Sequence, residues 1–129
     1  EVDLEIDPIF LGQSQADGIR NMALFDVIVN NTDRKFGHIL PLNQDEIFGC
    51  DHGVTFHQDY KLRTVLWQFA DLPFTDHELK TLENLDCELT GLITDAENLA
   101  MDERVANLLR SGKFPLPPTD WPAIPWPPF

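Results

Sequence analysis

The alternation of apolar and polar positions predicts the elements of the first quarter of the chain. Residues 1–13 start with alternating apolar and acidic positions, which predicts a short strand or extended arm that Pro8 ends. Residues 14–29 begin polar and become almost wholly apolar. This pattern is typical of a helix whose C-terminal part is buried. Ser14 or Asp17 is a candidate cap for that helix.

Two short apolar runs, residues 36–42 and 46–51, follow this helix. Turn-forming residues 43–45 separate them, so we predict an antiparallel hairpin. Position 38 opens one predicted strand and position 51 closes its partner. His38 and Asp51 should therefore lie at the same end of the hairpin.

The following segments predict three helices. Residues 61–71 are apolar with embedded cations, and we favour a helix over a strand there. Thr75 and Thr94 each begin a capping box, the S/T-x-x-E pattern that marks a helix N-terminus. The second of these helices should stop at Ser111-Gly112. The first has leucines at spacings of three and four, at positions 79, 82, 85, 89 and 92.

The composition changes at Phe114. Seven of the ten prolines and two of the three tryptophans lie in residues 114–129. Such a tail should be extended and polyproline-like, and it is either a ligand for a groove on a partner or a strap across its own domain. We favour the strap, because two exposed tryptophans are a liability. The sequence thus predicts an α+β, mainly helical domain over residues 1–113 with a packed tail.

Charge and cysteine content narrow the class of protein. The chain has 22 acidic and 9 basic residues, a net charge of −13. This balance argues against nonspecific nucleic-acid binding and against polybasic docking on membranes. No run approaches a transmembrane helix, and no signal peptide opens the chain. Cys50 and Cys87 are too few for a disulfide framework, so we expect free thiols and a cytoplasmic location.

Two acidic groups follow buried-looking segments. Asp33 comes shortly after the apolar residues 22–29, and Asp51 follows the second apolar run of the hairpin. A magnesium–phosphate site needs one carboxylate that orients or deprotonates the attacking hydroxyl and another that holds the metal. The hairpin brings His38 within reach of the same ion. The nearby cations suit a phosphate-bearing ligand, although ion pairs with carboxylates explain them equally well.

Four motifs together resemble the bacterial phosphatidylinositol 3/4-kinase-like family. They are NNTDRKFGH at residues 30–38, DHGVTFH at 51–57, KLRTVLW at 61–67 and PWPPF at 125–129. The resemblance covers nearly the whole chain but only the C-terminal lobe of a kinase. It implies an ATP-dependent phosphotransferase with a catalytic loop at residues 30–38 and a metal loop at 50–53.

The resemblance also implies roles for individual residues. Asp33 corresponds to the catalytic aspartate, with Arg34 beside it in the catalytic loop. Asp51 corresponds to the metal-binding aspartate. Asn31 and Lys35 are the candidate nucleotide-binding residues.

His38 departs from the pattern, because the family at large has asparagine as a second metal ligand there. Magnesium prefers oxygen donors to imidazole. Three alternatives follow: His38 binds a metal such as Mn²⁺ in place of Mg²⁺, it bonds a phosphate, or Asn30 or Asn31 replaces it as ligand. A purely structural role in the hairpin is the fourth.

The sequence lacks the N-terminal half of a kinase site. Gly12 and Gly18 form no glycine-rich loop, and no lysine precedes Lys35. We therefore expect a separate N-terminal lobe as a partner, and an isolated chain without transferase activity. A metal-binding pseudokinase or interaction module and a metal-dependent phosphohydrolase are the alternatives. The phosphoryl acceptor stays open between lipid, protein and small molecule.

Overall fold

The structure is a computed structural model that describes residues 1–43, 45–86 and 88–129. Gln44, in the predicted hairpin turn, and Cys87, a predicted free thiol, lie outside the described residues. The fold is α+β and mainly helical, as predicted. Its elements are the helices α1 (Pro8–Gly12), α2 (Asp17–Val29), α3 (Asp76–Glu83) and α4 (Asp95–Ser111), the 3₁₀ turns η1 (Phe36–His38) and η2 (Trp67–Phe69), and the strands β1 (Ile39–Pro41) and β2 (Ile47–Gly49).

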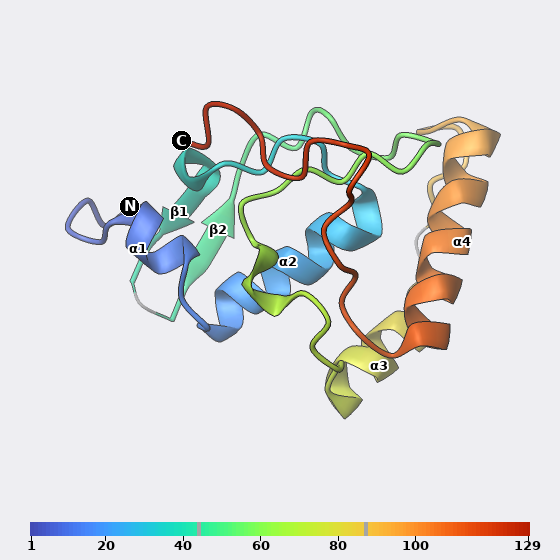
Figure 1. The fold of residues 1–129 in the computed structure, drawn as a ribbon, viewed down its shortest axis with the longest axis horizontal. Coiled ribbons are helices and arrows are strands. Elements are labelled where there is room, and N and C mark those ends of the chain that lie inside the picture. Colours follow the sequence, from blue (N-terminus) through green and yellow to red (C-terminus); the bar gives the residue numbers. More distant parts are fainter. Residues whose placement is uncertain (44, 87) are drawn as a thin grey trace.

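Helix α2 runs through the middle of the molecule (Figure 1). The hairpin and α1 lie towards one end of it, and α3 and α4 lie towards the other. Its apolar face includes Ile19, Met22 and Val27, all buried. These side chains belong to one core with Phe69 of η2, Leu108 of α4 and neighbouring apolar residues. Each such side chain stabilises the fold by roughly 1.5–3 kcal/mol when fully buried.

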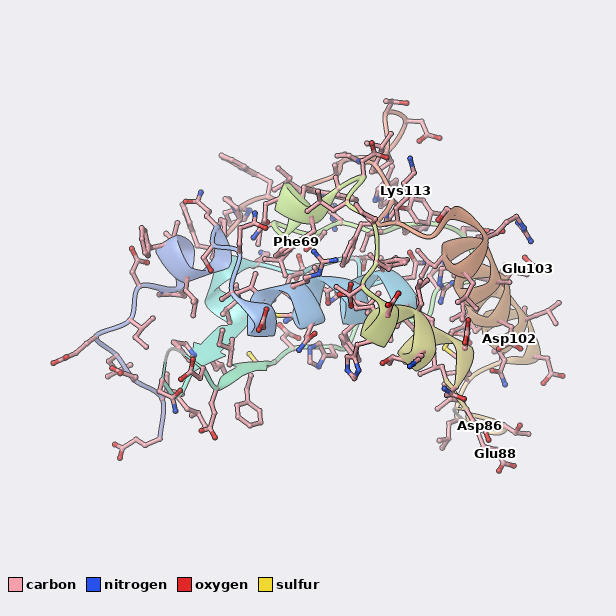
Figure 2. The ribbon with its side chains drawn as sticks, turned by 90° about the horizontal axis from the view of Figure 1, so that it is seen from below. Phe69, Asp86, Glu88, Asp102, Glu103 and Lys113 are labelled. Carbon is pink, nitrogen blue, oxygen red and sulfur yellow. The ribbon has the colours of Figure 1, made fainter. Side chains whose placement is uncertain are left out.

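Part of the acidic surface lies at the α3–α4 end (Figure 2). Figure 2 shows the side chains of Asp86, Glu88, Asp102 and Glu103 gathered there. Phe69, by contrast, lies in the interior beside α2. The same end thus holds part of the chain's net charge of −13.

The predicted N-terminal arm is wrong, because Pro8 begins a helix instead of ending a strand. The Asp7 carboxylate accepts a hydrogen bond from the Ile9 N–H, and Pro8 occupies the first turn, where its missing N–H costs nothing. Helix α2 begins at Asp17, later than predicted. Its N-cap is Ala16, whose side chain makes no capping bond, so neither predicted cap serves that position.

The predicted helix over residues 61–71 is also wrong. The backbone there pairs with the loop after α2: Arg34 N donates to Arg63 O, and Val65 N donates to Arg34 O. This parallel bridge holds the segment extended, and only η2 is helical within it. Tertiary pairing has overridden an ambiguous local pattern.

The two predicted capping boxes are confirmed at Thr75 and Thr94. Helix α4 ends as predicted, at Gly112 in the left-handed conformation with φ of +70°. Helix α3 is shorter than predicted and ends at Glu83. The leucines at 89 and 92 lie beyond it, in a turn closed by a hydrogen bond from Leu92 N to Leu89 O.

The C-terminal tail runs back from α4 towards the hairpin (Figure 1). Ala123 O accepts hydrogen bonds from Thr64 N and from the Trp67 indole, and Pro128 O accepts one from Phe36 N. Pro125 is fully buried. The tail therefore lies against its own domain, although Trp126 is 87% exposed. Across the described residues, no helix is both long and apolar enough to cross a bilayer.

An ion pair between Arg20 and Glu78 joins α2 to α3. The guanidinium donates two hydrogen bonds to the carboxylate, at 2.9 and 2.7 Å. Burial alone would raise the pKa of the Glu78 carboxyl. The hydrogen bonds from Arg20 and from the Thr75 N–H outweigh burial and hold this pKa below its usual value.

This depressed pKa predicts acid-sensitive stability. The contribution is complete above the unfolded value of 4.5 and is lost as pH falls through the lower folded pKa. Glu78→Gln, which keeps the capping box, should lower the free energy of unfolding by roughly 1–3 kcal/mol at neutral pH. Urea unfolding of the two proteins at several pH values measures this difference in the free energy of unfolding. A difference between the two proteins that stays constant down to pH 3 would contradict the assignment.

Candidate active site

A buried ion pair between Asp26 and Arg34 lies beneath the candidate site. Both side chains have no exposed surface, and Arg34 Nη2 lies 2.9 Å from Asp26 Oδ1. Arg34 Nε also donates to both carboxylate oxygens, and the Thr64 hydroxyl lies 3.5 Å from Oδ2. Asp26 is thus a buried structural carboxylate. It fixes the loop that follows α2, because Arg34 belongs to that loop.

Two buried asparagines shape the same loop. Asn30 ends α2 in the left-handed conformation, and its amide donates to the carbonyls of His57 and Asp59. The Asn31 amide donates to Asp26, and its carbonyl accepts from the Asp33 N–H. Every polar group of these two side chains thus serves the backbone or Asp26, so the loop has a single arrangement.

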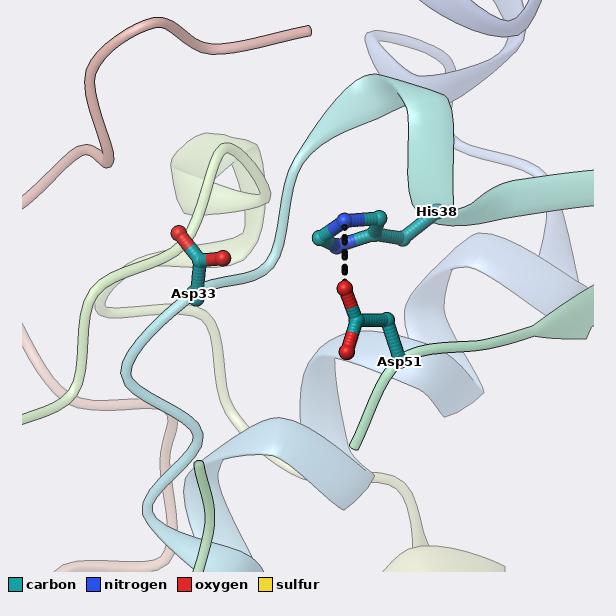
Figure 3. Close-up of side chains that lie close together, drawn as sticks. All are labelled: Asp33, His38 and Asp51. Atoms are coloured by element: carbon teal, nitrogen blue, oxygen red, sulfur yellow. Dashed lines mark ion pairs between the residues drawn. The ribbon is translucent and has the colours of Figure 1, made fainter. Parts of the chain in front are cut away.

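The hairpin brings three predicted site residues together. Strands β1 and β2 pair antiparallel, with Ile39 opposite Gly49. His38, at the end of η1, and Asp51, beyond β2, then lie 3.4 Å apart, from Nε2 to Oδ2. One ligand atom each from Asp33, His38 and Asp51 lies within 4.8 Å of the others. Figure 3 shows all three side chains at this open end.

Asp51 has a backbone φ of +59°, in the left-handed region. Aspartate tolerates this region better than most residues, but it still costs free energy. The side chain is 65% exposed, whereas those of Asp33 and His38 are 30% and 15% exposed. The Asp51 carboxylate is therefore accessible to a ligand from solvent.

The hydrogen bonds of His38 indicate its tautomer. Nδ1 lies 3.3 Å from the Lys35 N–H, which makes it an acceptor. In the neutral ring the proton is then on Nε2, the nitrogen that faces Asp51. The Nε2 proton of His38 is then on the side of the Asp51 carboxylate, whose Oδ2 lies 3.4 Å from Nε2. His38 becomes a metal ligand through Nε2 only if the proton moves to Nδ1, opposite a backbone N–H.

His52 connects the buried pair to the metal loop. Arg34 Nη2 lies 2.7 Å from His52 Nε2, so the imidazole accepts this hydrogen bond in its neutral form. Burial, followed by the charge of Arg34, holds the pKa of His52 below its usual value.

The structure separates the predicted site residues into two groups. Asp33, His38 and Asp51 converge, and Lys35 Nζ lies 4.0 Å from Asp33 Oδ1. Asn31 and Arg34 instead have no exposed surface and bond to Asp26. Both therefore position the loop, and neither is open to a nucleotide. Their position directly after an apolar run is the sequence signal for this role.

The donor set fits a divalent cation in part. Two carboxylates that converge, with one largely exposed, are the oxygen ligands that Mg²⁺ and Mn²⁺ accept alongside water. The imidazole of His38 fits less well as a ligand, because its Nδ1 accepts from Lys35 N–H and its Nε2 then carries the proton. Asp33 and Asp51 are the residues that would hold such an ion.

Comparisons with known proteins give two relatives. Protein Rv2133c of Mycobacterium tuberculosis is 39% identical over 131 residues, covering 95% of this chain and 47% of that protein. Phosphatidylinositol 4-kinase gamma 5 of Arabidopsis thaliana is 31% identical over 86 residues, 55% of this chain and 14% of that protein. The chain thus spans about half the length of the first relative and a much smaller part of the second. No family model and no solved structure matches it.

The buried pair predicts a large stability loss in Arg34→Met. Removing one partner leaves Asp26 charged and buried, which costs about 3–5 kcal/mol. Lys113→Met is the control, because the Lys113–Asp71 pair is half exposed and contributes about 0–1 kcal/mol. Urea unfolding at neutral pH compares the variants. Equal losses in the two would show that the Asp26–Arg34 pair is not a special constraint.

The tautomer of His38 predicts a particular metal response. Mg²⁺ and Mn²⁺ should both raise the melting temperature, and Asp51→Asn should remove most of this increase. His38→Asn should retain it for both ions, because the imidazole is a donor and not a ligand. Thermal melting at matched ionic strength measures the effect. Selective loss of the Mn²⁺ response in His38→Asn would instead make His38 a metal ligand.

Proposed function

We propose that this chain is the metal-binding, catalytic part of a phosphatidylinositol-kinase-like phosphotransferase. The observation that supports the proposal is the convergence of Asp33, His38 and Asp51 at the open end of the hairpin. The partial similarity to a plant phosphatidylinositol 4-kinase supports the same reaction class. Nucleotide binding and the remainder of the site belong to the longer protein in this proposal, since the chain spans 47% of its mycobacterial relative.

Asp33 is the proposed base that orients the acceptor hydroxyl and takes its proton. Its backbone N–H is fixed by Asn31, and its carboxylate is partly exposed, so it is both positioned and accessible. A base must come within hydrogen-bond reach of the proton that it removes. Lys35, 4.0 Å from Asp33, adds positive charge where phosphate oxygens would approach.

Asp51 is the proposed anchor of the divalent cation, and His38 orients it. A metal bound to the phosphates would neutralise charge that develops on the transferred group. His38 Nε2 lies 3.4 Å from one Asp51 oxygen and leaves the other free. This division of roles agrees with the strained backbone at Asp51, which is typical of functional positions.

The test is phosphoryl transfer by the full-length protein. Asp33→Asn should lower the turnover of radiolabelled ATP by about 10²–10⁴-fold, the usual contribution of a general base. Asp59→Asn is the matched control, because Asp59 is an exposed carboxylate on the neighbouring loop. Its variant should retain full turnover.

Two outcomes would contradict the proposal. If Asp33→Asn retains wild-type turnover, Asp33 is not the base. If the protein hydrolyses phosphate esters in an Asp33-dependent way and transfers nothing from ATP, the site is that of a phosphohydrolase. Circular dichroism should show the native fold in both variants.

A further inference from the structure

A cavity lies beside the loop that carries Asp33, and its lining includes basic side chains. Its volume is about 310 Å³. Lys61 and Arg63 come from the extended segment that follows the metal loop. His57 lies between the metal loop and this segment, and Trp121 belongs to the C-terminal tail. Thr32, the neighbour of Asp33, also lines the cavity. The cavity therefore opens next to the proposed base.

The two cations of this cavity lack carboxylate partners in the described part of the chain. The ion pairs there involve Arg20, Arg34, Lys35, His38 and Lys113, and include neither Lys61 nor Arg63. Other lysines and arginines of the described residues also lack such a pair, but these two lie side by side in the lining of one cavity. Two that line one cavity indicate a site for a negative group from outside the chain.

Both cations are held in place by their surroundings. The backbone N–H of Lys61 donates to the Asn30 side chain, and Arg63 Nε donates to Thr32 O at 2.8 Å. The ring of Trp121 lies 5.5 Å from Lys61 Nζ and 5.8 Å from Arg63 Cζ, within cation–π range. The tail thus forms a wall of the cavity, and the charges are preorganised.

Two residues of the lining, Trp121 and His57, have further N–H donors. The indole Nε1 of Trp121 is buried and has no hydrogen-bond partner among the described residues. His57 Nδ1 accepts from the Asp59 N–H, so the neutral ring has its proton on Nε2, which is then a donor. A buried N–H without an acceptor is destabilising, and a ligand oxygen would satisfy it.

The two hydroxyl groups of the lining already donate to backbone carbonyls, and its one carboxylate is an acceptor. Thr32 donates to Val54 O, and Thr55 donates to His52 O. Glu97 lines the cavity, and its carboxylate accepts from the Thr94 N–H in the capping box of α4. The negative charge of Glu97 would repel a bound anion, so removing this charge tests whether the cavity binds anions.

We infer that this cavity binds an oxyanion, such as the phosphate or carboxylate group of a ligand, through Lys61, Arg63, His57 and Trp121. Its place as an acceptor site next to Asp33 rests on the proposed function. Binding itself needs only the residues of the cavity. The C-terminal tail then has a role in recognition, because Trp121 completes the site.

The direct test follows the indole N–H signal of Trp121 in ¹⁵N-labelled protein during titration with inorganic phosphate. Trp121→Phe assigns the signal, and Trp67 and Trp126 are internal controls. The Trp121 signal should shift with saturation, while the other two stay fixed. Sodium chloride at the same ionic strength should not reproduce the shift.

Variants test the charges one at a time. Lys61→Met should weaken phosphate binding by about tenfold, the loss expected for one charge-assisted hydrogen bond. Lys80→Met, which removes an exposed cation from α3, should leave it unchanged. Glu97→Gln should tighten it, because glutamine preserves the capping box and removes the opposing charge. Absence of a Trp121 shift, or equal effects of Lys61→Met and Lys80→Met, would overturn the inference.

Two further titrations identify the source of the oxyanion. Glycerol 3-phosphate represents a soluble phosphate ester, and phosphatidylcholine vesicles with phosphatidylinositol represent a lipid headgroup. The net charge of −13 predicts that the soluble ester binds and that vesicles do not. Lys61-dependent vesicle binding would assign the same cavity to a lipid headgroup. Phosphate binding without Asp33-dependent turnover would refute the proposed function and leave the cavity assignment intact.

Discussion

The buried pair of Asp26 and Arg34 is the constraint on which the candidate site depends. A charge with no exposed surface is tolerated only when it is paired and hydrogen-bonded, and Asp26 accepts from Asn31 and from Arg34. Because these partners lie in the loop after α2, that loop has one arrangement in which the carboxylate is satisfied. Asp33 lies between them and is left facing outward.

The same interaction extends to the metal loop. Arg34 also contacts Cys50 O and His52, on either side of Asp51. One guanidinium therefore ties the loop that carries Asp33 to the loop that carries Asp51. Groups that must act together within a few ångströms are best held by such shared buried contacts, since loops alone are mobile. Arg34 is therefore a buried positioning residue for both loops.

Sequence patterns predicted what depends on local interactions. Both capping boxes, the glycine stop at Gly112 and the hairpin were found, because each is specified within a few residues. The strands of the hairpin are shorter than predicted, and Phe36–His38 forms a 3₁₀ turn instead of the start of a strand. The extended segment after residue 61 was missed, since its structure comes from pairing with Arg34 and from the tail. The convergence of Asp33 with Asp51 was expected, whereas the burial of Asn31 and Arg34 follows from contacts with Asp26 that no local pattern records.

The most direct test of this account locates a bound metal ion. Crystals of the protein soaked in Mn²⁺ would reveal the ion by its anomalous scattering. The account predicts one ion within bonding distance of the carboxylates of Asp33 and Asp51, with His38 beside Asp51 but not bound to the ion. An ion bound elsewhere, or an empty site at saturating Mn²⁺, would contradict the claim that these loops converge to hold a metal.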